Sequence, residues 1–388
     1  MKILWGSPLP PTRSGVSDYA VELLGELGSL AKVRVLEPPG WHRPDDWSLD
    51  ETVELVPSET APSSDEISLL HLGNNPHHRW LLDRLGQPRT VVVMHDLVLH
   101  HLLVEATAAE GDDEHFEKDL VFAHGTAGRA LARARRAGLT GARDPFLFPA
   151  RAAYLEHAVG VIVHSRWAQR ILTAERPHIP IAKVGLPAAD PGIVDRGEQR
   201  RHLGVPADEV LLMHLGFLSP EKGLADVVTG VAAAVRAGVP ARLMLVGEGG
   251  GLDDLLTAAA RAGIGDRVGT TGWLPPSEFL RIPSAADVGV VLRTPSAGET
   301  SAAAVRFLAC GTPVAVGGTS QFLEWPETAA PRITPGPPAP AEIARVLAEA
   351  AAGGAGWDER RRAARAAYEK DHRPADTARQ MIEFLATL

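Results

Sequence analysis

The chain has 388 residues, a length that exceeds one ordinary hydrophobic core and favours two domains. Apolar residues make up 45% of the sequence and charged residues 22%, values that are typical of globular proteins and exclude a disordered chain. The net charge of −9 includes no basic block that could follow a phosphate backbone, so a nucleic-acid partner is not expected.

Cysteine usage and hydropathy bear on the cellular compartment. The single cysteine, Cys310, cannot form an intrachain disulfide, which fits a reducing environment. The N-terminal residues contain no apolar stretch suited to a signal peptide, and no later segment has the apolar run that a spanning helix needs. We therefore expect a cytoplasmic protein with no transmembrane segment.

Short apolar runs alternate with amphipathic stretches from the first residues onward, a pattern typical of βαβ units and parallel sheets. In the first half the predicted strands are residues 2–5, 33–36, 68–72, 91–94, 161–164 and 181–184. The same alternation begins again in the second half, with predicted strands at residues 210–215, 242–246, 268–271, 288–292 and 313–316. The sequence thus predicts an α/β fold with two Rossmann-like domains.

A segment with little periodicity separates the two halves. Residues 185–208 are rich in proline, glycine and charge, so the domain boundary is predicted there. The end of the sequence has helical spacing, with apolar residues suited to one buried face. The expected organisation is a first domain over 1–186, a linker over 187–207, a second domain over 208–370 and a final helix over 371–388.

The loop after the first predicted strand ends in Ser14-Gly15 and leads into a helical pattern. Small residues let the backbone approach an oxygen-rich group closely, and the free N–H groups of a first helical turn favour an anion. Gly15 is therefore a candidate anion contact, although a structural turn capped by serine explains the same residues. The loop lacks the three spaced glycines of a dinucleotide site, so a nicotinamide cofactor gains little support.

Two polar stretches follow predicted strands of the first half. Asn74 and His78 come after residues 68–72, and His95 and Asp96 come after residues 91–94. Doubly wound sheets bind ligands at the carboxyl ends of their strands, so both stretches are expected to line one cleft.

The adjacent histidines at 77–78 and 100–101 suggest zinc, but neighbouring side chains on a helix diverge and no matching cysteine or carboxylate set accompanies them. No metal site is predicted.

Two segments of the second half combine a turn with groups that suit phosphate. Lys222 lies in a glycine-bearing turn after residues 210–215, where a lysine can reach a phosphate but is more often merely solvated. Glu299, Thr300 and Ser301 precede a predicted helix. The N–H groups near Thr300 and Ser301 would face the phosphate of a sugar phosphate, and Glu299 could accept hydrogen bonds from sugar hydroxyls. Helix capping alone explains the same three residues.

These segments occur in the same order as the matching motifs of the retaining GT-B glycosyltransferases of family 4. The chain resembles that family over essentially its whole length. Residues 216–223 resemble the family's Gly-Arg-x-x-x-x-Lys-Gly element. Residues 299–313 resemble its glutamate-rich donor motif, followed by a helix and a Gly-x-Pro-Val strand. The resemblance implies two Rossmann-like domains that face each other across a cleft, an acceptor in the first and a nucleotide sugar in the second. It also implies a final helix that packs back on the first domain.

The resemblance further implies retaining transfer from a nucleoside diphosphate sugar to an unidentified acceptor, with no metal or other cofactor. No Asp-x-Asp motif is present, and in this family the leaving phosphate is often proposed to take the acceptor's proton. His95 resembles a family histidine near the transferred sugar, so His95 and Glu299 are predicted to be catalytic. Asn74, His78 and Asp96 are placed on the acceptor side. The predicted donor-binding residues are Gly15, Lys222, Thr300, Ser301, Arg293 and Leu274.

Two positions depart from the family pattern. Phe217 stands where the family has an arginine, and Arg306 falls where it has a second glutamate that holds the ribose hydroxyls. Arg293 or Arg306 could supply the missing charge, although Arg306 could equally be an exposed helix residue. The Gly-Glu-Thr-Ser form resembles a branch of the family with an altered motif, which favours a variant donor site. The alternatives are a non-catalytic binding subunit and a GT-B sugar-nucleotide epimerase.

Overall fold

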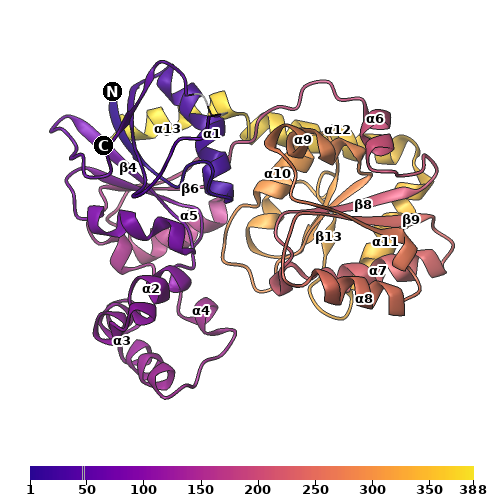
Figure 1. Ribbon diagram of the computed structural model, residues 1–388, viewed down its shortest axis with the longest axis horizontal. Helices are drawn as coiled ribbons and strands as arrows, with labels where there is room; N and C mark the ends of the chain where they lie inside the picture. Colours follow the sequence, from indigo (N-terminus) through magenta and orange to yellow (C-terminus); the bar gives the residue numbers. More distant parts are fainter. Residues whose placement is uncertain (46, 48) are drawn as a thin grey trace. The chain divides into compact units, whose positions relative to one another are not determined.

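The computed structural model describes residues 1–45, 47 and 49–388 (Figure 1). The chain divides into two compact units, each built around one parallel sheet. Unit 1 consists of Met1–Pro187, Ala297–Thr300 and Pro374–Leu388. Unit 2 consists of Ala188–Ser296 and Ser301–Arg373. Two parallel-sheet α/β domains agree with the predicted fold class.

Among the described residues, seven parallel strands form the sheet of unit 1, in the order β3-β2-β1-β4-β5-β6-β7. The strands are β1 (Lys2–Gly6), β2 (Lys32–Leu36), β3 (Val53–Val56), β4 (Glu66–Leu72), β5 (Thr90–Met94), β6 (Gly160–Val163) and β7 (Ile181–Lys183). The central strands are buried along nearly their whole length, as expected for a sheet covered on both faces. The strand order reverses between β1 and β4, so the carboxyl ends of these strands are the expected ligand-binding position.

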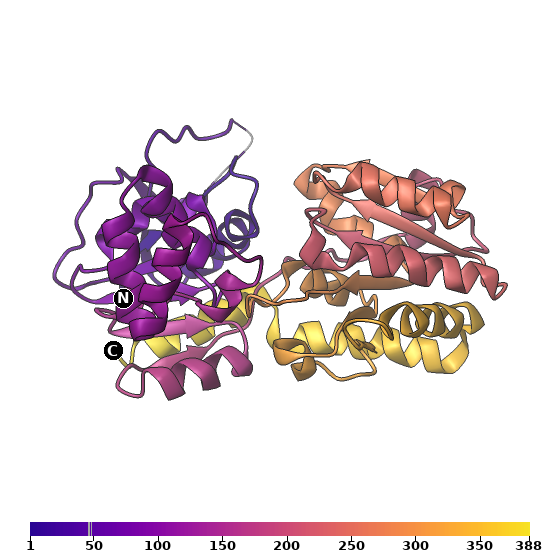
Figure 2. The ribbon, with the colours of Figure 1, turned by 90° about the horizontal axis from the view of Figure 1, so that it is seen from below.

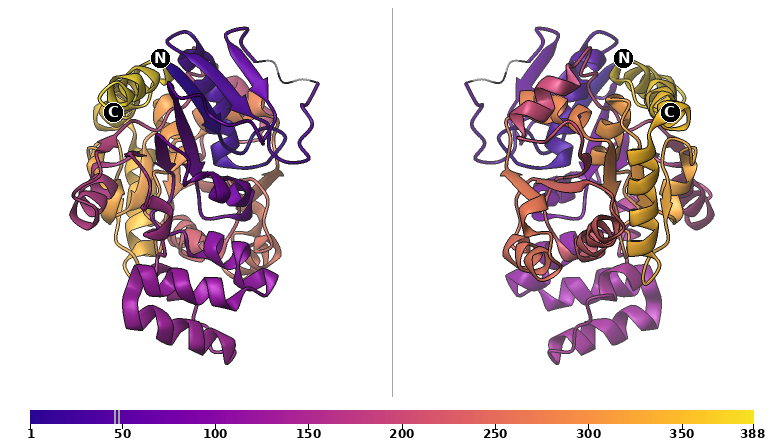
Figure 3. Two further views of the ribbon diagram at one scale, coloured as in Figure 1. Left: turned by 90° about the vertical axis from the view of Figure 1, so that its left-hand side faces the viewer. Right: turned by 90° about the vertical axis from the view of Figure 1, so that its right-hand side faces the viewer.

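Helices cover both faces of this sheet. The helices of unit 1 are α1 (Gly15–Gly28), η1 (Pro76–Arg84), α2 (His100–Ala106), η2 (Ala108–Glu110), α3 (Asp113–Arg136), α4 (Asp144–Leu147), η3 (Ala153–Leu155), α5 (Arg166–Glu175) and α13 (Pro374–Leu385). Helices α1 and α13 pack against each other, and Figure 1 shows α2, α3 and α4 on the other side of the sheet. Helix α3 bends at Gly125, where φ is 60° and ψ −136°, and Figure 3 shows its two segments.

Helix α1 illustrates how the sequence specifies one of these elements. The Ser14 hydroxyl caps the helix by accepting a hydrogen bond from the Ser17 N–H at 3.1 Å. Buried side chains then recur at the three- and four-residue spacing of one helix face, at Val16, Tyr19, Ala20, Leu23, Leu24 and Leu27. The same spacing in α13 buries Ala378, Met381 and Leu385, and α13 packs against α1.

Unit 2 repeats the architecture with six parallel strands in the described chain, in the order β10-β9-β8-β11-β12-β13. These are β8 (Val210–Leu215), β9 (Ala241–Val246), β10 (Val268–Gly272), β11 (Val288–Val291), β12 (Val314–Gly317) and β13 (Arg332–Ile333). Strand order reverses between β8 and β11, which marks the carboxyl ends of these two strands as the expected ligand position in this unit.

The helices of unit 2 also form two layers. They are α6 (Arg196–His202), η4 (Pro220–Lys222), α7 (Leu224–Arg236), α8 (Leu252–Arg261), η5 (Gly265–Arg267), α9 (Pro276–Arg281), η6 (Ile282–Ala285), α10 (Ala302–Ala309), η7 (Ser320–Glu324), α11 (Ala339–Ala352) and α12 (Gly354–Asp371). Figure 2 shows α8, α7 and α11 side by side on one face, and α7 packs against both neighbours. Helices α9, α10 and α12 lie on the other face (Figure 1).

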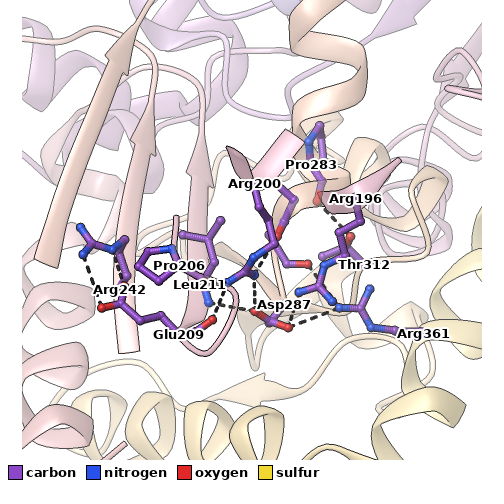
Figure 4. Close-up of polar contacts among 12 residues, drawn as sticks. Arg196, Arg200, Pro206, Glu209, Leu211, Arg242, Pro283, Asp287, Thr312 and Arg361 are labelled. Carbon is purple, nitrogen blue, oxygen red and sulfur yellow. Dashed lines mark hydrogen bonds and ion pairs between the residues drawn. The ribbon is translucent and has the colours of Figure 1, made fainter. Parts of the chain in front are cut away.

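A charged network ties α6 to the sheet of unit 2 (Figure 4). The carboxylate of Asp287 accepts a hydrogen bond from the Arg200 guanidinium at 3.0 Å and another from the Leu211 N–H at 2.9 Å. Arg196 also binds this carboxylate, and Arg361 lies 3.5 Å from it. The side chains of Arg200 and Asp287 are only 9% and 13% exposed, so both charges depend on this pairing for their compensation.

Every predicted strand is present, with ends displaced by no more than two residues. The described residues form two further strands, β3 and β13, which lie at sheet edges. Strand β3 reads Val-Glu-Leu-Val and β13 has two residues, so neither has the apolar run of a buried central strand. The segment expected as a linker contains helix α6, whose sequence is mostly charged. Ion pairs with Asp287, rather than an apolar face, hold this helix in place.

Candidate functional site

A cluster of aromatic and imidazole rings lies where several strands of unit 1 end. His71 is on β4, His95 follows β5 and His164 follows β6. The His71 Nδ1 and His95 Nε2 atoms are 3.0 Å apart, and the rings of His95 and His164 have centroids 5.1 Å apart. Tyr19 from α1 meets His95 edge-on at 4.8 Å, and Trp5 from β1 lies 3.9 Å from His71. We call these five residues the histidine cluster.

Hydrogen bonds to the backbone orient the imidazoles. His78 Nδ1–H donates to the His71 carbonyl at 2.8 Å, and His164 Nδ1–H donates to the Val184 carbonyl at 3.2 Å. Burial, reinforced by the neighbouring histidines, holds the pKa values of His71 and His95 well below the ordinary histidine range. Both rings are therefore neutral at pH 7. His71 is fully buried, whereas His95 is partly exposed and can exchange hydrogen bonds with hydroxyl groups without supplying a charge.

Acidification should destabilise unit 1 because the imidazoles of His71, His78 and His95 all have lowered pKa values. Burial lowers the pKa of His78 to about 4, whereas an unfolded histidine titrates near pH 6.5, so the unfolded chain binds protons first as pH falls. The stabilisation is complete above about pH 6.5 and is lost between about pH 6.5 and pH 4, by roughly 3 kcal/mol for His78 alone. Urea unfolding at pH 7.5 and pH 5 measures the loss, and tryptophan fluorescence follows the transition.

A pair of variants assigns this pH dependence. His78→Asn can keep the hydrogen bond to the His71 carbonyl but cannot titrate, so the stability of this variant should vary less with pH. His77→Asn, on the exposed neighbouring residue, should leave the wild-type pH dependence unchanged. A His78→Asn variant that retains the full wild-type slope would show that the acid sensitivity arises elsewhere.

The residues expected on the acceptor side differ in their placement. The Asn74 N–H donates to Asp96 Oδ2 at 2.8 Å, and the Asn74 side-chain oxygen accepts from the His101 N–H at 2.8 Å, in the first turn of α2. Asn74 and Asp96 are partly exposed and join the loops after β4 and β5. His78 is fully buried, which differs from the expectation that it lines an open site, because its ring packs beneath Gly73 and holds the His71 backbone.

The segment Ala297–Thr300 belongs to unit 1 and lies against the loop after β5. The Leu97 N–H donates to the Ala297 carbonyl at 2.8 Å, and the Thr300 hydroxyl donates to the His164 carbonyl at 3.1 Å. One end of the segment is thus fixed two residues after His95, and the other at a histidine of the cluster.

Gly298 is required for this close approach. Its φ is +82°, and a Cβ at this position would lie 2.9 Å from the Trp167 ring and 3.0 Å from Leu97. Glu299 follows directly and is partly exposed. The two residues predicted as catalytic, His95 and Glu299, come from distant stretches of sequence but lie in loops that contact each other at one edge of the same sheet.

Unit 2 places two cations where its strand order reverses. Lys222 ends η4 after β8, and Arg293 follows β11. The Thr294 N–H donates to the Glu221 carbonyl at 3.0 Å, which ties the loop after β11 to η4. Burial, with the charges of Lys222 and then Arg293, lowers the pKa of His214 on β8 to about 4. Two cationic residues therefore lie on linked loops at the carboxyl ends of β8 and β11, an arrangement suited to a diphosphate.

The remaining predicted donor residues have varied surroundings. Gly15 is the exposed first residue of α1, and no described atom lies within 4 Å of a Cβ built there. Ser301 is 2% exposed, and its hydroxyl caps α10 by accepting a hydrogen bond from the Ala304 N–H at 3.4 Å. Leu274 is partly exposed in the loop between β10 and α9. The capping interpretation accounts for the Ser301 side chain.

The two departures from the family pattern also have clear positions. Phe217, which replaces the arginine, is 57% exposed after β8. Arg306 is not an exposed helix residue: it is 6% exposed on α10, with its guanidinium 5.4 Å from the Phe279 ring. Arg293, which follows β11 and acts on the same neighbours as Lys222, is the better placed substitute for the missing charge.

Two kinds of feature, a metal-binding cluster and a membrane-spanning helix, are absent from the described residues. Within residues 1–45, 47 and 49–388, no group of His, Cys, Asp or Glu side chains is arranged to hold a metal ion. No helix in this part of the chain is both long enough and apolar enough to cross a membrane.

The second half of the chain matches a known enzyme family. Residues 195–370 match the family described as "Glycosyl transferases group 1". The 2-deoxystreptamine glucosyltransferase of Streptomyces kanamyceticus is 33% identical over 161 residues, which are 41% of this chain and 40% of that protein. The chain therefore matches less than half the length of this relative.

Solved structures match the fold along the whole chain. HepE of Anabaena, in complex with UDP, has a TM-score of 0.64 and 17% identity and covers 100% of both chains. WaaG, a glycosyltransferase involved in lipopolysaccharide biosynthesis, has a TM-score of 0.59 and 13% identity and covers 99% of both chains. At these identities the likeness shows the fold, which is GT-B. Residues 195–370 thus carry the sequence pattern of the group 1 glycosyl transferases, within a chain whose two units have the GT-B fold.

Proposed function

We propose that this protein is a retaining glycosyltransferase that moves a hexosyl group from a nucleoside diphosphate sugar to an acceptor, without a metal ion. The observation that carries the proposal is the pair of cations Lys222 and Arg293 at the reversal of strand order in unit 2. Both belong to the region that matches the group 1 glycosyl transferases. HepE binds UDP, so UDP sugars are the first donors to test.

In the proposed reaction, negative charge builds on the departing diphosphate. Lys222, Arg293 and the N–H groups near Gly15, Thr300 and Ser301 stabilise that charge, which is the largest electrostatic requirement of such a transfer. Leu274 completes the set of donor contacts. These roles need no metal, because side-chain cations and backbone N–H groups supply the compensating charge.

The sugar is held by groups of unit 1. Glu299 accepts hydrogen bonds from donor-sugar hydroxyls, and the neutral His95 ring exchanges hydrogen bonds with the sugar or the acceptor. The bond between the anomeric carbon and the phosphate oxygen breaks, and the acceptor oxygen bonds to that carbon on the same face. The acceptor's proton passes to the leaving phosphate oxygen, so retention requires no separate protein base.

The experiment has two stages. A thermal-shift screen against UDP, GDP and TDP and their sugar conjugates identifies the donor, because a ligand of the folded state raises the Tm. Release of nucleoside diphosphate from that conjugate is then measured with and without candidate acceptors. Acceptor-stimulated release supports the transferase.

The loss of the family arginine at Phe217 favours a non-catalytic subunit as the second candidate, which would bind the conjugate and release nothing. A sugar-nucleotide epimerase would release an altered conjugate without an acceptor.

Lys222→Ala should weaken UDP binding about tenfold to a hundredfold while leaving uridine binding nearly unchanged. The expected loss corresponds to one charge-assisted hydrogen bond to phosphate, which uridine lacks. Isothermal titration calorimetry with both ligands measures the difference. Lys370→Ala, on an exposed lysine of α12, is the control and should bind both ligands as the wild type does. Equal weakening for UDP and uridine would remove Lys222 from the phosphate site.

A further inference from the structure

The histidine cluster contains a hydrogen bond between two imidazoles, and its direction determines which group His95 offers to a ligand. The His71 Nδ1 and His95 Nε2 atoms are 3.0 Å apart, so one of these nitrogens carries a proton and the other accepts the hydrogen bond. His95 is partly exposed, whereas His71 is fully buried. Because His71 engages Nε2 of His95, Nδ1 is the nitrogen of the His95 ring that remains for a ligand.

The backbone fixes the protons of two neighbouring rings. Nδ1 of His78 lies 2.8 Å from the His71 carbonyl oxygen, and Nδ1 of His164 lies 3.2 Å from the Val184 carbonyl oxygen. A carbonyl oxygen can only accept, so each ring carries a proton on Nδ1, and in the neutral ring Nε2 is a bare lone pair. Nε2 of His78 is inaccessible to solvent and has no partner in the described chain. At His78 the cluster therefore leaves a buried acceptor unpaired, and not a buried N–H donor.

The same reasoning locates the proton of His71. Its Nε2 atom is also inaccessible to solvent and lacks a partner among the described residues. A proton on Nε2 would leave a buried N–H donor unsatisfied, whereas a proton on Nδ1 leaves only a lone pair. Orphaned buried N–H groups are rarer in native proteins than under-satisfied acceptors. His71 therefore donates its Nδ1–H to Nε2 of His95, and the neutral His95 ring carries its own proton on Nδ1.

Packing and backbone pairing hold the two rings in this arrangement. The centroid of the His71 ring lies 3.9 Å from that of Trp5 and 5.3 Å from that of Tyr19. The His95 N–H donates to the Leu72 carbonyl at 2.9 Å, which continues the pairing of β4 with β5 and fixes the His95 backbone beside His71. The contact between the imidazoles is thus set by the fold and needs no ligand.

We infer that His71 is a positioning residue that fixes His95 as a hydrogen-bond donor, through its Nδ1–H, to an oxygen of the bound sugar or acceptor. Nδ1 then has no lone pair, so His95 cannot take the proton of the acceptor hydroxyl on that side. This agrees with the proposed passage of that proton to the leaving phosphate. The inference rests on the proposed function for the identity of the ligand, while the position of the proton is a property of the free protein.

Nitrogen NMR of the ligand-free protein tests the position of the proton directly. In a long-range proton–nitrogen correlation spectrum of protein with isotope-labelled histidine, protonated and bare ring nitrogens have well-separated shifts. The signals that His95→Gln removes belong to His95. At neutral pH the wild type should show a protonated Nδ1 and a bare Nε2 for His95. A proton on Nε2, or one averaged over both nitrogens, would overturn the inference.

Two substitutions of His71 separate positioning from packing. His71→Leu keeps an apolar side chain inside β4 but removes the donor, whereas His71→Asn offers an amide N–H near the position of Nδ1. In this fully buried place leucine should give the higher Tm. The kcat should follow the opposite order, with a loss of about tenfold or more in His71→Leu and a smaller loss in His71→Asn. The Kd for UDP should change less than about twofold in both variants.

The spectra of these variants complete the test. His71→Leu should let the His95 proton occupy either nitrogen, and His71→Asn should keep it on Nδ1. His100→Leu, on a buried histidine of α2 outside the cluster, is the control and should leave the His95 signals unchanged. Values of kcat that rank the two His71 variants as the Tm does would make His71 purely structural. The wild-type spectrum decides the tautomer even if substitutions of His71 do not fold. A proton on Nδ1 of His95 without turnover of any donor would support the pairing and contradict the transferase.

Discussion

His95→Ala should lower the rate of sugar transfer about 100-fold while changing the Kd for UDP less than about twofold. The reason is that the proposed contacts to the nucleotide come mainly from unit 2, whereas His95 bonds to the reacting hydroxyl groups. An interaction made chiefly in the transition state lowers kcat and kcat/KM together. Steady-state kinetics with the identified donor measure the rates, and calorimetry measures the Kd.

A second variant separates this role from a structural one. His95 bonds to His71 at 3.0 Å, so alanine also leaves a buried imidazole nitrogen unpaired. His95→Gln can retain a hydrogen bond to His71 and should preserve the Tm better than alanine does, but it should not restore transfer. His77→Ala, on an exposed neighbour of the cluster, should leave both properties intact. Full transfer activity in either His95 variant would exclude His95 from the chemistry.

Asp287→Ala should destabilise unit 2 by about 3–5 kcal/mol. The substitution removes the carboxylate that compensates the buried Arg200 guanidinium and leaves the Leu211 N–H without that acceptor. Urea unfolding followed by tryptophan fluorescence measures the change in the free energy of unfolding, and calorimetry measures the thermal transitions. The transitions of the two units are fitted separately. Asp254→Ala, on an exposed residue of α8, should stay within about 0.5 kcal/mol of the wild type. The Arg200 guanidinium also donates to three backbone carbonyls, those of Ala285, Pro206 and Glu209. A small effect of Asp287→Ala would show that these carbonyls compensate Arg200 without the carboxylate.

The strands were predictable because each central strand is buried on both faces and reads as an apolar run. The position of the candidate site was predictable for a related reason, since residues that directly follow parallel strands meet at one edge. That argument locates His95 and Asp96. It does not find His71, because this residue lies inside the apolar run of β4 and has no polar neighbour to mark it. The pairing of His71 with His95 depends on the register of β4 and β5, which the sequence leaves open.

Other features depend on contacts between distant segments. No local pattern indicates that Ala297–Thr300 packs in unit 1, because the contact is made by backbone groups of Leu97 and by the absence of a side chain at Gly298.

The composition of unit 1 from separate stretches of chain has a consequence for synthesis on the ribosome. Helix α13, which packs against α1, lies in the last stretch, Pro374–Leu388. All residues of unit 2 leave the ribosome before α13 does, so unit 2 can fold first although unit 1 begins the sequence. Until then, α1 lacks α13 as one of its packing partners. The order of translation is thus the reverse of the order in which the two units can reach their final packing.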